Sequence, residues 1–451
     1  MIINFLIIIQ EITMKLSKYV RTIKYNDEVI LYNTVDHAMV QLPKEAVKGN
    51  ELEDILDDDS LSALREMGYL VETDTLVENQ MESYLINRTK LFISVELNLS
   101  CNLRCPYCYQ AGTHNGKCVD DRVLEKIVDY ANAVYQKDPF SDLFLKILGG
   151  EPTLVWQKFE KIYGDLLRFC NEKGVKMHLL VDTNGTMIND LLTLSGYASL
   201  LFTIPLTAKE CHDDVRKDAK GNGTYDLIIE NINIIKREKP EAKIVIRYNV
   251  DNENVKLFDI FLEDIERKLT FKPLISVNYT AELNKKKDFG NRMTYREFVE
   301  WSSSEAIDSL IKNKMPVTIS PIVSVEECQF RSKYGLKVFS DGTVGSCAMD
   351  FFENGRMSID ELLFEIDEDN PFSLKKKNQT IMVDEQCLKC DSIFLCGGTN
   401  KLPCIKALDY DLCKDKHFGI DIDMFIKKYM ECQENNTSDL FVVFENGESY
   451  R

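Results

Sequence analysis

The sequence has no apolar run long enough to cross a bilayer. One apolar run, from Ile2 to Ile9, is far shorter than the about 20 residues that a membrane-spanning helix needs. Residues 1–13 also lack the basic start and the small-residue cleavage site of a secretory signal peptide. We therefore interpret residues 1–13 as an extension or a misassigned start ahead of Met14, and we expect a cytoplasmic protein with no membrane partner.

Positive charge is also scarce. There are 55 Lys and Arg residues against 73 Asp and Glu residues, which gives a net charge of −18. This balance disfavours nucleic acid and anionic membrane surfaces as partners. It is compatible with a basic partner peptide, although a solubilising acidic surface is the simpler explanation. The chain of 451 residues allows two to four domains of about 100–200 residues each.

The 14 cysteines are clustered, and in a reducing cytosol clustered cysteines indicate metal ligands or catalytic groups. Cys101, Cys105 and Cys108 lie on one short stretch. Structural zinc sites and iron–sulfur cubanes usually take four ligands, so three cysteines leave one coordination position open, as a catalytic site requires. The alternative is a zinc site that a distant cysteine or histidine completes. Seven more cysteines lie between residues 328 and 413. The remaining four cysteines stand alone: Cys118, Cys170, Cys211 and Cys432.

The middle of the chain alternates strand-like runs with helical patterns. Helices are predicted behind Asp120-Asp121, from Val155 to Cys170 and from Tyr225 to Ile235. This alternation predicts an α/β fold with a parallel sheet, curved or closed, whose chemistry lies at the C-terminal ends of the strands. Three unusual loops, CNLRCPYC, GGEP and DTNG, directly follow the first three strands. The predicted strands are 91–97, 143–148, 176–181, 200–206, 243–250 and 274–279.

Both ends of the chain differ from this middle region. Three short strands within 19–43, turning at Asn26-Asp27, precede helical patterns at 51–56 and 60–71, so residues 14–90 are predicted to form a winged-helix-like domain. Residues 294–312 are predicted to be helical. The cysteine-rich region 301–451 follows, with a hairpin predicted at 338–347 around Asp341-Gly342.

The stretch CNLRCPYCY with GGEPTL at 149–154 resembles the radical S-adenosylmethionine (radical SAM) superfamily. The resemblance implies a partial (β/α)6 TIM-like barrel over 91–300, with a 4Fe–4S cluster on the three cysteines and SAM on its open iron. Reductive cleavage of SAM would then give a 5′-deoxyadenosyl radical that abstracts hydrogen. By correspondence, Gly149, Gly150 and Glu151 would bind the SAM amino group. Tyr107 would lie against adenine, and Asn184 would belong to the SAM-binding wall.

Residues 209–235 are similar to a segment of radical SAM enzymes that modify proteins and peptides. The resemblance implies that Arg216 or Arg247 holds the SAM carboxylate. The family's usual Ser-Leu-Asp-Gly is replaced by a stretch within TIPLTA at 203–208, so the contacts of that element are not predicted here. His212 is expected to be a structural histidine rather than a catalytic one.

The C-terminal cysteines resemble the SPASM extension of those enzymes, which implies two auxiliary 4Fe–4S clusters and three clusters in all. The alternative is a structural zinc ribbon built on Cys387 and Cys390. Asn400 stands where the family has a cysteine, and Cys404 is the substitute. The first auxiliary cluster would then keep an open iron for a substrate thiolate. Its ligands would be Cys328, Cys347 and Cys404. Those of the second would be Cys387, Cys390, Cys396 and Cys413.

The N-terminal domain resembles leader-peptide recognition elements, which bind a peptide as an added strand. The alternative is a packing or dimerisation domain. Together the resemblances imply a precursor peptide with a leader and a flavodoxin- or ferredoxin-type electron donor as partners. The function predicted first is crosslink formation on that peptide, foremost a cysteine thioether. The alternatives are formylglycine formation as in anaerobic sulfatase maturases, epimerisation, carbon–carbon crosslinking, or a non-catalytic cluster-bearing protein. Ala348 stands where sulfatase maturases carry an aspartate, which favours the crosslink.

Overall fold

The structure is a computed structural model, and its chain divides into two compact units. One unit combines Met1–Ser83 with Asp384–Gly397, and the other combines Tyr84–Val383 with Gly398–Arg451. Among the described residues, none of the helices has the length and apolar character needed to pass through a membrane. The described residues are 14–48, 51–52, 56–74, 90–108, 110, 116–280, 293–319, 334–345, 356–365, 390–391, 393–396 and 421–441.

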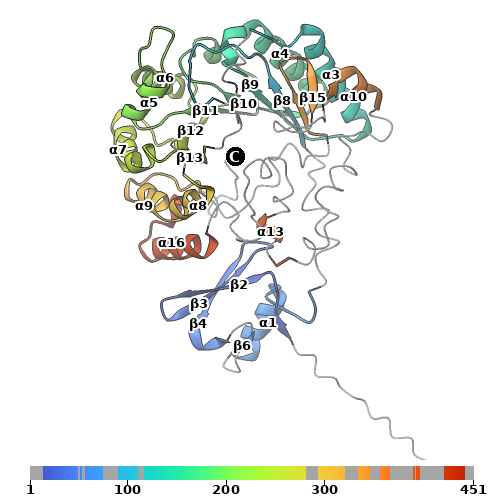
Figure 1. The fold of residues 1–451 in the computed structure, drawn as a ribbon. Coiled ribbons are helices and arrows are strands. Elements are labelled where there is room, and N and C mark those ends of the chain that lie inside the picture. Colours follow the sequence, from blue (N-terminus) through green and yellow to red (C-terminus); the bar gives the residue numbers. More distant parts are fainter. Residues whose placement is uncertain are drawn as a thin grey trace, which may run out of the picture. The chain divides into compact units, whose positions relative to one another are not determined.

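The larger unit is built on a curved sheet with six parallel strands in consecutive order (Figure 1). These strands confirm the six that the sequence predicted, with bounds shifted by at most one residue. Their C-terminal ends therefore share one edge of the sheet, and the three unusual loops lie there. The strands are β8 (Lys90–Glu96), β9 (Asp142–Leu148), β10 (Lys176–Asp182), β11 (Ser199–Pro205), β12 (Lys243–Val250) and β13 (Leu274–Tyr279).

Burial alternates along these strands. On β9, Leu143, Leu145 and Ile147 are fully buried, while the residues between them are partly exposed. Helices cover the buried face, and the partly exposed residues lie on the opposite, inner face (Figure 1). Asp120 begins the first helix by accepting a hydrogen bond from the Arg122 backbone N–H. The helices of this layer are α3 (Asp121–Lys137), α4 (Trp156–Lys173), α5 (Lys209–Val215), α6 (Tyr225–Glu238) and α7 (Phe258–Lys268). Short 3-10 turns lie at Pro152–Val155, Asp190–Thr193 and Asn254–Leu257.

The hairpin predicted around Asp341-Gly342 is confirmed as β14 (Leu336–Val338) and β15 (Thr343–Gly345). Gly342 has φ 86°, the left-handed conformation that such a turn favours. The sequence did not predict that β14 also pairs in parallel with β8, so the hairpin extends the barrel sheet. Strand β16 (Met357–Ser358) and helix α10 (Ile359–Glu365) follow, and Asp360 pairs with Lys126 of α3.

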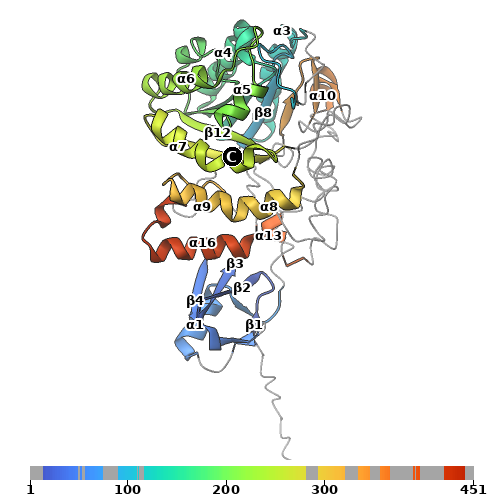
Figure 2. The same cartoon turned by 60° about the vertical axis from the view of Figure 1, so that its left-hand side comes forward.

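The helix predicted over 294–312 is two helices, α8 (Tyr295–Ser303) and α9 (Glu305–Lys312), because the chain bends at Ser304. Thr294 and Glu297 form a capping box at the start of α8. Helix α16 (Ile422–Glu434) lies alongside this pair (Figure 2). Lys428 of α16 forms an ion pair with Asp308 at 2.8 Å. A 3-10 turn, Ser438–Leu440, follows α16.

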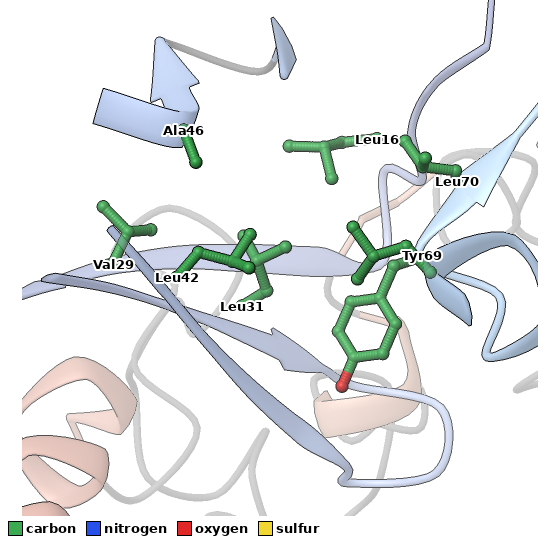
Figure 3. Close-up of a cluster of buried hydrophobic side chains, with 8 residues drawn as sticks. Leu16, Val29, Leu31, Leu42, Ala46, Tyr69 and Leu70 are labelled. Carbon is green, nitrogen blue, oxygen red and sulfur yellow. The ribbon is translucent and has the colours of Figure 1, made fainter. Parts of the chain in front are cut away.

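The three strands predicted within 19–43 are confirmed in the smaller unit, and they pair as an antiparallel sheet in the order β2 (Val20–Tyr25), β3 (Glu28–Asn33) and β4 (Met39–Pro43). A cluster of apolar side chains, including Leu31 and Tyr69, fills its core (Figure 3). The prediction of a helix over 51–56 is wrong for its first two residues. Glu51–Leu52 form strand β6, which pairs with β5 (Val47–Lys48). The second predicted helix is α1 (Asp58–Glu66), and the chain then forms β7 (Leu70–Val71), paired with β1 (Lys15–Leu16). A 3-10 turn lies at Lys44–Ala46.

A short cysteine-bearing helix from far along the sequence belongs to this smaller unit. Helix α13 (Ile393–Cys396) buries its first three side chains. The ring of Phe394 meets the ring of Tyr19 edge to face, with centroids 5.1 Å apart. Apolar burial and this aromatic contact therefore join the segment carrying Cys390 and Cys396 to the N-terminal strands.

The buried face of the barrel sheet generates a stability prediction. Phe202 lies on β11 and is fully buried, so Phe202→Ala should lower the free energy of unfolding by about 4 kcal/mol, through lost transfer energy and a cavity. Chemical denaturation followed by circular dichroism measures this. The control is Leu227→Ala on α6, whose side chain is 46% exposed. Equal losses in the two variants would contradict the assignment of β11 to the core.

Candidate active site

The three cysteines lie on the loop that leaves β8. Cys101, Cys105 and Cys108 are free and half-buried. The backbone N–H of Cys108 donates to the carbonyl of Cys105 at 3.3 Å. Burial raises the pKa of the Cys101 thiol and raises that of Cys108 to about 11. Both thiols are therefore protonated at neutral pH until a metal displaces the proton.

Nothing in the described part of the chain gathers three or more His, Cys, Asp or Glu side chains so as to hold a metal ion. An iron–sulfur cluster differs from a single ion, because its ligands bind separate iron atoms. Three thiols that serve a cluster are therefore not required to converge on one point. The cluster on Cys101, Cys105 and Cys108 therefore stays a prediction from their spacing in the sequence.

Two glycines bring the loop after β9 against the loop that carries the cysteines. Gly150 donates its backbone N–H to the carbonyl of Asn98 at 2.9 Å, and Glu151 donates to that of Ser100 at 2.8 Å. A Cβ on Gly150 would lie 2.1 Å from the Ser100 carbonyl oxygen, and one on Gly149 would lie 2.5 Å from Asn98 Oδ1. No side chain fits in either gap, so glycine is required at both positions.

Glu151 is fully buried, and its carboxylate joins the loops after β9 and β10. One oxygen accepts hydrogen bonds from the Thr153 hydroxyl at 2.7 Å, the Thr153 backbone at 3.2 Å and the Thr183 hydroxyl at 2.9 Å. The other accepts from the Asn184 backbone N–H at 2.7 Å. Burial raises the pKa of Glu151, and these donors oppose that shift. The role predicted for Glu151 at the SAM amino group stays a prediction, since the described contacts are all internal to the protein.

Asn184 connects the DTNG loop to the cysteine loop. Its amide donates to Asn102 Oδ1 at 2.7 Å and lies 3.7 Å from the Cys101 sulfur. Asn102 in turn donates to the Thr186 hydroxyl at 2.8 Å. The sequence singled out Asn184, whereas the spacing of residues gave no signal for Asn102, Asn98 or Thr183. Those three are recognised only from their contacts.

Arg216 reaches the cysteine loop from the end of α5. One guanidinium nitrogen donates to the Tyr107 hydroxyl at 3.0 Å and lies 3.8 Å from the Cys105 sulfur. The side chain is 4% exposed, and its Nε and second terminal nitrogen have no hydrogen-bond partner among the described residues. Burial raises the pKa of Tyr107, although Arg216 opposes the shift. Leaving buried guanidinium donors unused is costly, so they fit an incoming carboxylate such as that of SAM.

His212 is enclosed in the same segment. It is fully buried, its ring meets Tyr225 edge to face with centroids 5.5 Å apart, and Nε2 lies 3.2 Å from the Thr224 hydroxyl. Burial, together with the nearby Arg216 charge, lowers the pKa of His212 to about 2. These contacts agree with the structural role that the sequence suggested.

Most of the predicted auxiliary ligands lie outside the described residues. Cys390 is described with its side chain, 3.8 Å from the Asp391 carboxylate, and Cys396 ends helix α13. The assignment of the auxiliary clusters therefore stays a prediction. The ligands outside the described residues are Cys328, Cys347, Cys387, Cys404 and Cys413.

Comparison with known proteins identifies the barrel. Residues 95–265 match the Radical SAM superfamily, and this span contains the cysteine loop, GGEP, DTNG and Arg216. The barrel is a radical SAM domain. The family implies a 4Fe–4S cluster and SAM as cofactors, and the three cysteines and the unused donors of Arg216 fit these groups.

The radical SAM domain resembles that of sulfatase-maturating enzymes. The chain is 32% identical over 187 residues to the cysteine-type anaerobic sulfatase-maturating enzyme of Clostridium novyi, a match covering 39% of this chain and 49% of that relative. It is 26% identical over 340 residues to the enzyme of the same name from Clostridium perfringens, covering 66% and 85%. The solved structure of native anSMEcpe with bound AdoMet and Kp18Cys peptide superposes with a TM-score of 0.57 at 21% identity, over 78% of this chain and 99% of that one. This likeness shows a shared fold.

The close approach of the two loops generates a prediction about cluster assembly. Gly150→Ala should displace the Ser100 carbonyl and with it Cys101, at a cost of about 3 kcal/mol, and lower the iron bound after anaerobic reconstitution. Iron analysis and thermal melting measure both effects. The control is Gly164→Ala within α4, where the added Cβ meets nothing within 4 Å. That change should keep full iron and gain about 0.5–1 kcal/mol from helix propensity. Normal iron content in Gly150→Ala would contradict the prediction.

Burial of His212 predicts a pH dependence of stability. The pKa is lower in the folded chain than in the unfolded chain, so the unfolded chain gains a proton as pH falls through its own pKa of about 6.5. The His212 contribution is therefore complete above that pH and declines below it, by about 1.4 kcal/mol between about pH 7.5 and about pH 5.5. Urea denaturation of the wild type and of His212→Gln at both values measures it. An equal pH dependence in the two proteins would contradict the prediction.

Proposed function

We propose that this chain uses its radical SAM domain to modify a ribosomally made precursor peptide, most simply by forming a cysteine thioether crosslink. The observation that carries the proposal is the meeting of the cysteine loop, Gly149-Gly150 and the buried Arg216 at one edge of the sheet. When bound, the 4Fe–4S cluster and SAM supply a 5′-deoxyadenosyl radical that removes hydrogen from the substrate.

The chain's own residues would bind and orient these groups. Cys101, Cys105 and Cys108 would ligate the cluster. Arg216 would pair its unused donors with the SAM carboxylate, and it fixes the Tyr107 hydroxyl at 3.0 Å, which supports a defined position for the ring against adenine. The backbone around the two glycines would receive the amino group, and Asn184 would border the site.

A second candidate, formylglycine formation, has specific support. Two of the curated relatives are cysteine-type anaerobic sulfatase-maturating enzymes, and native anSMEcpe has been solved with bound AdoMet and the Kp18Cys peptide. Against it stands Ala348, where the sequence pattern of those enzymes has an aspartate. The products differ in chemistry, so one experiment separates them.

The strand arrangement of the smaller unit supports a role in binding the leader of the peptide. Strands β2 and β4 are the outer strands of their three-stranded sheet, and outer strands carry backbone groups to which an extended peptide can add. We take leader binding to be the task of this unit. Three 4Fe–4S clusters and a flavodoxin- or ferredoxin-type electron donor complete the proposal. The first auxiliary cluster, with Cys328, Cys347 and Cys404, would receive the substrate thiolate.

The test is anaerobic incubation of the reconstituted enzyme with SAM, reductant and the product of the neighbouring small open reading frame. We expect 5′-deoxyadenosine, and a peptide that has lost two hydrogens and a free thiol. Loss of two hydrogens with the thiol retained indicates a carbon–carbon crosslink. Exchange of the thiol for an aldehyde that a hydrazine traps indicates formylglycine. An unchanged mass with altered chirality indicates epimerisation.

Cysteine variants provide the matched control. Cys105→Ala should reduce 5′-deoxyadenosine to the background of the assay, because the cluster loses a ligand. Cys211→Ala, a free cysteine on α5 outside the triplet, should keep the wild-type yield. A wild-type yield from Cys105→Ala would contradict the proposed cluster site.

A further inference from the structure

Three charged side chains meet on the inner face of the barrel sheet, and we call them the barrel ion trio: Lys146 on β9, Asp182 on β10 and Arg247 on β12. Lys146 Nζ lies 3.0 Å from Asp182 Oδ2, and a terminal nitrogen of Arg247 lies 3.6 Å from the same oxygen. Their side chains remain 37%, 20% and 33% exposed. All three are therefore accessible from the face that the helices leave uncovered.

The trio lies between a stack of aromatic rings and the loops of the candidate site. Toward the N-terminal ends of the strands, the rings of Phe92, Phe144 and His178 stack across β8, β9 and β10, with centroids 4.7 and 4.4 Å apart. Toward the C-terminal ends, Asp182 directly precedes Thr183, whose hydroxyl holds Glu151. A group entering past the cysteine loop would thus meet the trio before the aromatic stack.

The trio has one more positive charge than negative charge. Although burial pushes the pKa of Asp182 upward, Lys146 and Arg247 bring it below its ordinary value, so the carboxylate is ionised beside two cations. Other acids on this face already have partners. Glu96 accepts from Gln110 at 2.8 Å and Ser340 at 2.8 Å, and Asp142 pairs with His178 at 2.7 Å.

Arg247 has unused binding capacity. A guanidinium binds a carboxylate best through two parallel hydrogen bonds. Among the described residues, Arg247 has one side-chain ion pair, in which a terminal nitrogen lies 3.6 Å from Asp182 Oδ2. A surplus cation on a concave, partly apolar face attracts an anion, although the whole chain carries a net charge of −18. Binding of a negatively charged substrate group would explain why two cationic side chains lie on the inner face of the sheet in an acidic protein.

We propose that Lys146 and Arg247 bind a carboxylate of the substrate peptide, an Asp or Glu side chain close to the residue that loses hydrogen. This inference depends on the proposed peptide-modifying function. The SAM carboxylate is the other source of the same chemistry. Arg216, with its unused donors beside Cys105, already provides a position for it, so the trio serves a second carboxylate.

Affinity selection tests the proposal without requiring turnover. The reconstituted enzyme with SAM and no reductant is mixed with randomised hexapeptides, each holding one cysteine, acetylated and amidated so that side chains carry the only carboxylates. Mass spectrometry identifies the retained peptides. Asp and Glu should be enriched about tenfold over Asn and Gln, as expected for charge-assisted hydrogen bonds. Arg247→Gln and, independently, Lys146→Gln should abolish the enrichment, and Arg247→Glu should favour Lys and Arg instead.

Matched controls separate the outcomes. Arg237→Gln on α6, an exposed arginine paired with Glu238, should keep the enrichment. No enrichment in the wild type, or enrichment that persists in Arg247→Gln and Lys146→Gln, overturns the proposal. SAM affinity measured without peptide should be unchanged in Arg247→Gln, and an about tenfold loss would assign the trio to the SAM carboxylate and also overturn it. Failure of the proposed function is a separate result: no change in the precursor peptide after incubation with SAM and reductant, whatever the hexapeptides show.

Discussion

The candidate site depends on direct backbone contact between two loops at the edge of the barrel sheet. The backbone N–H groups of Gly150 and Glu151 donate to the carbonyls of Asn98 and Ser100. The two loops are so close that neither Gly149 nor Gly150 has room for a Cβ. Since Ser100 immediately precedes Cys101, this contact fixes where the cysteine loop begins. Glu151 then extends the connection to the next strand through Thr183 and Asn184. Three loops from three strands are thereby held as one body around the cysteines.

The buried polar side chains around these loops differ in their hydrogen bonding. Glu151 is satisfied by protein donors, so its carboxylate stabilises the arrangement of the loops. His212 is enclosed and neutral, and its Nδ1 has no hydrogen-bond partner among the described residues. Arg216 is buried to a similar degree, but two of its guanidinium nitrogens have no hydrogen-bond partner among the described residues. This property is expected of a residue that binds a ligand. Glu151 and Arg216 therefore differ in what they can do: the carboxylate of Glu151 has its donors within the protein, whereas the guanidinium of Arg216 can still bind a ligand.

The cysteine-bearing helix α13 belongs to the same compact unit as the N-terminal strands, although more than 300 residues separate them in sequence. Contact between Tyr19 and Phe394 is part of this association. The sequence suggested a recognition domain and a separate cluster domain. Within the described residues, α13 and the N-terminal strands instead belong to one compact unit.

Sequence alone determined the six parallel strands, the loops that follow them and the cysteine triplet, because hydrophobic periodicity and cysteine spacing are local properties. It also gave the three strands of the smaller unit, but it assigned residues 51–52 to a helix, since a charged amphipathic run does not reveal that its backbone will pair with another strand. Tertiary structure decided the pairing of β14 with β8, the bend at Ser304 and the grouping of α13 with the N-terminal strands. It also decided the contacts of Asn98, Thr183 and Asn102 and the meeting of Lys146, Asp182 and Arg247. These pairings and contacts depend on which distant segments of the chain come together. Contacts between residues tens to hundreds of positions apart produce no periodic pattern in the sequence.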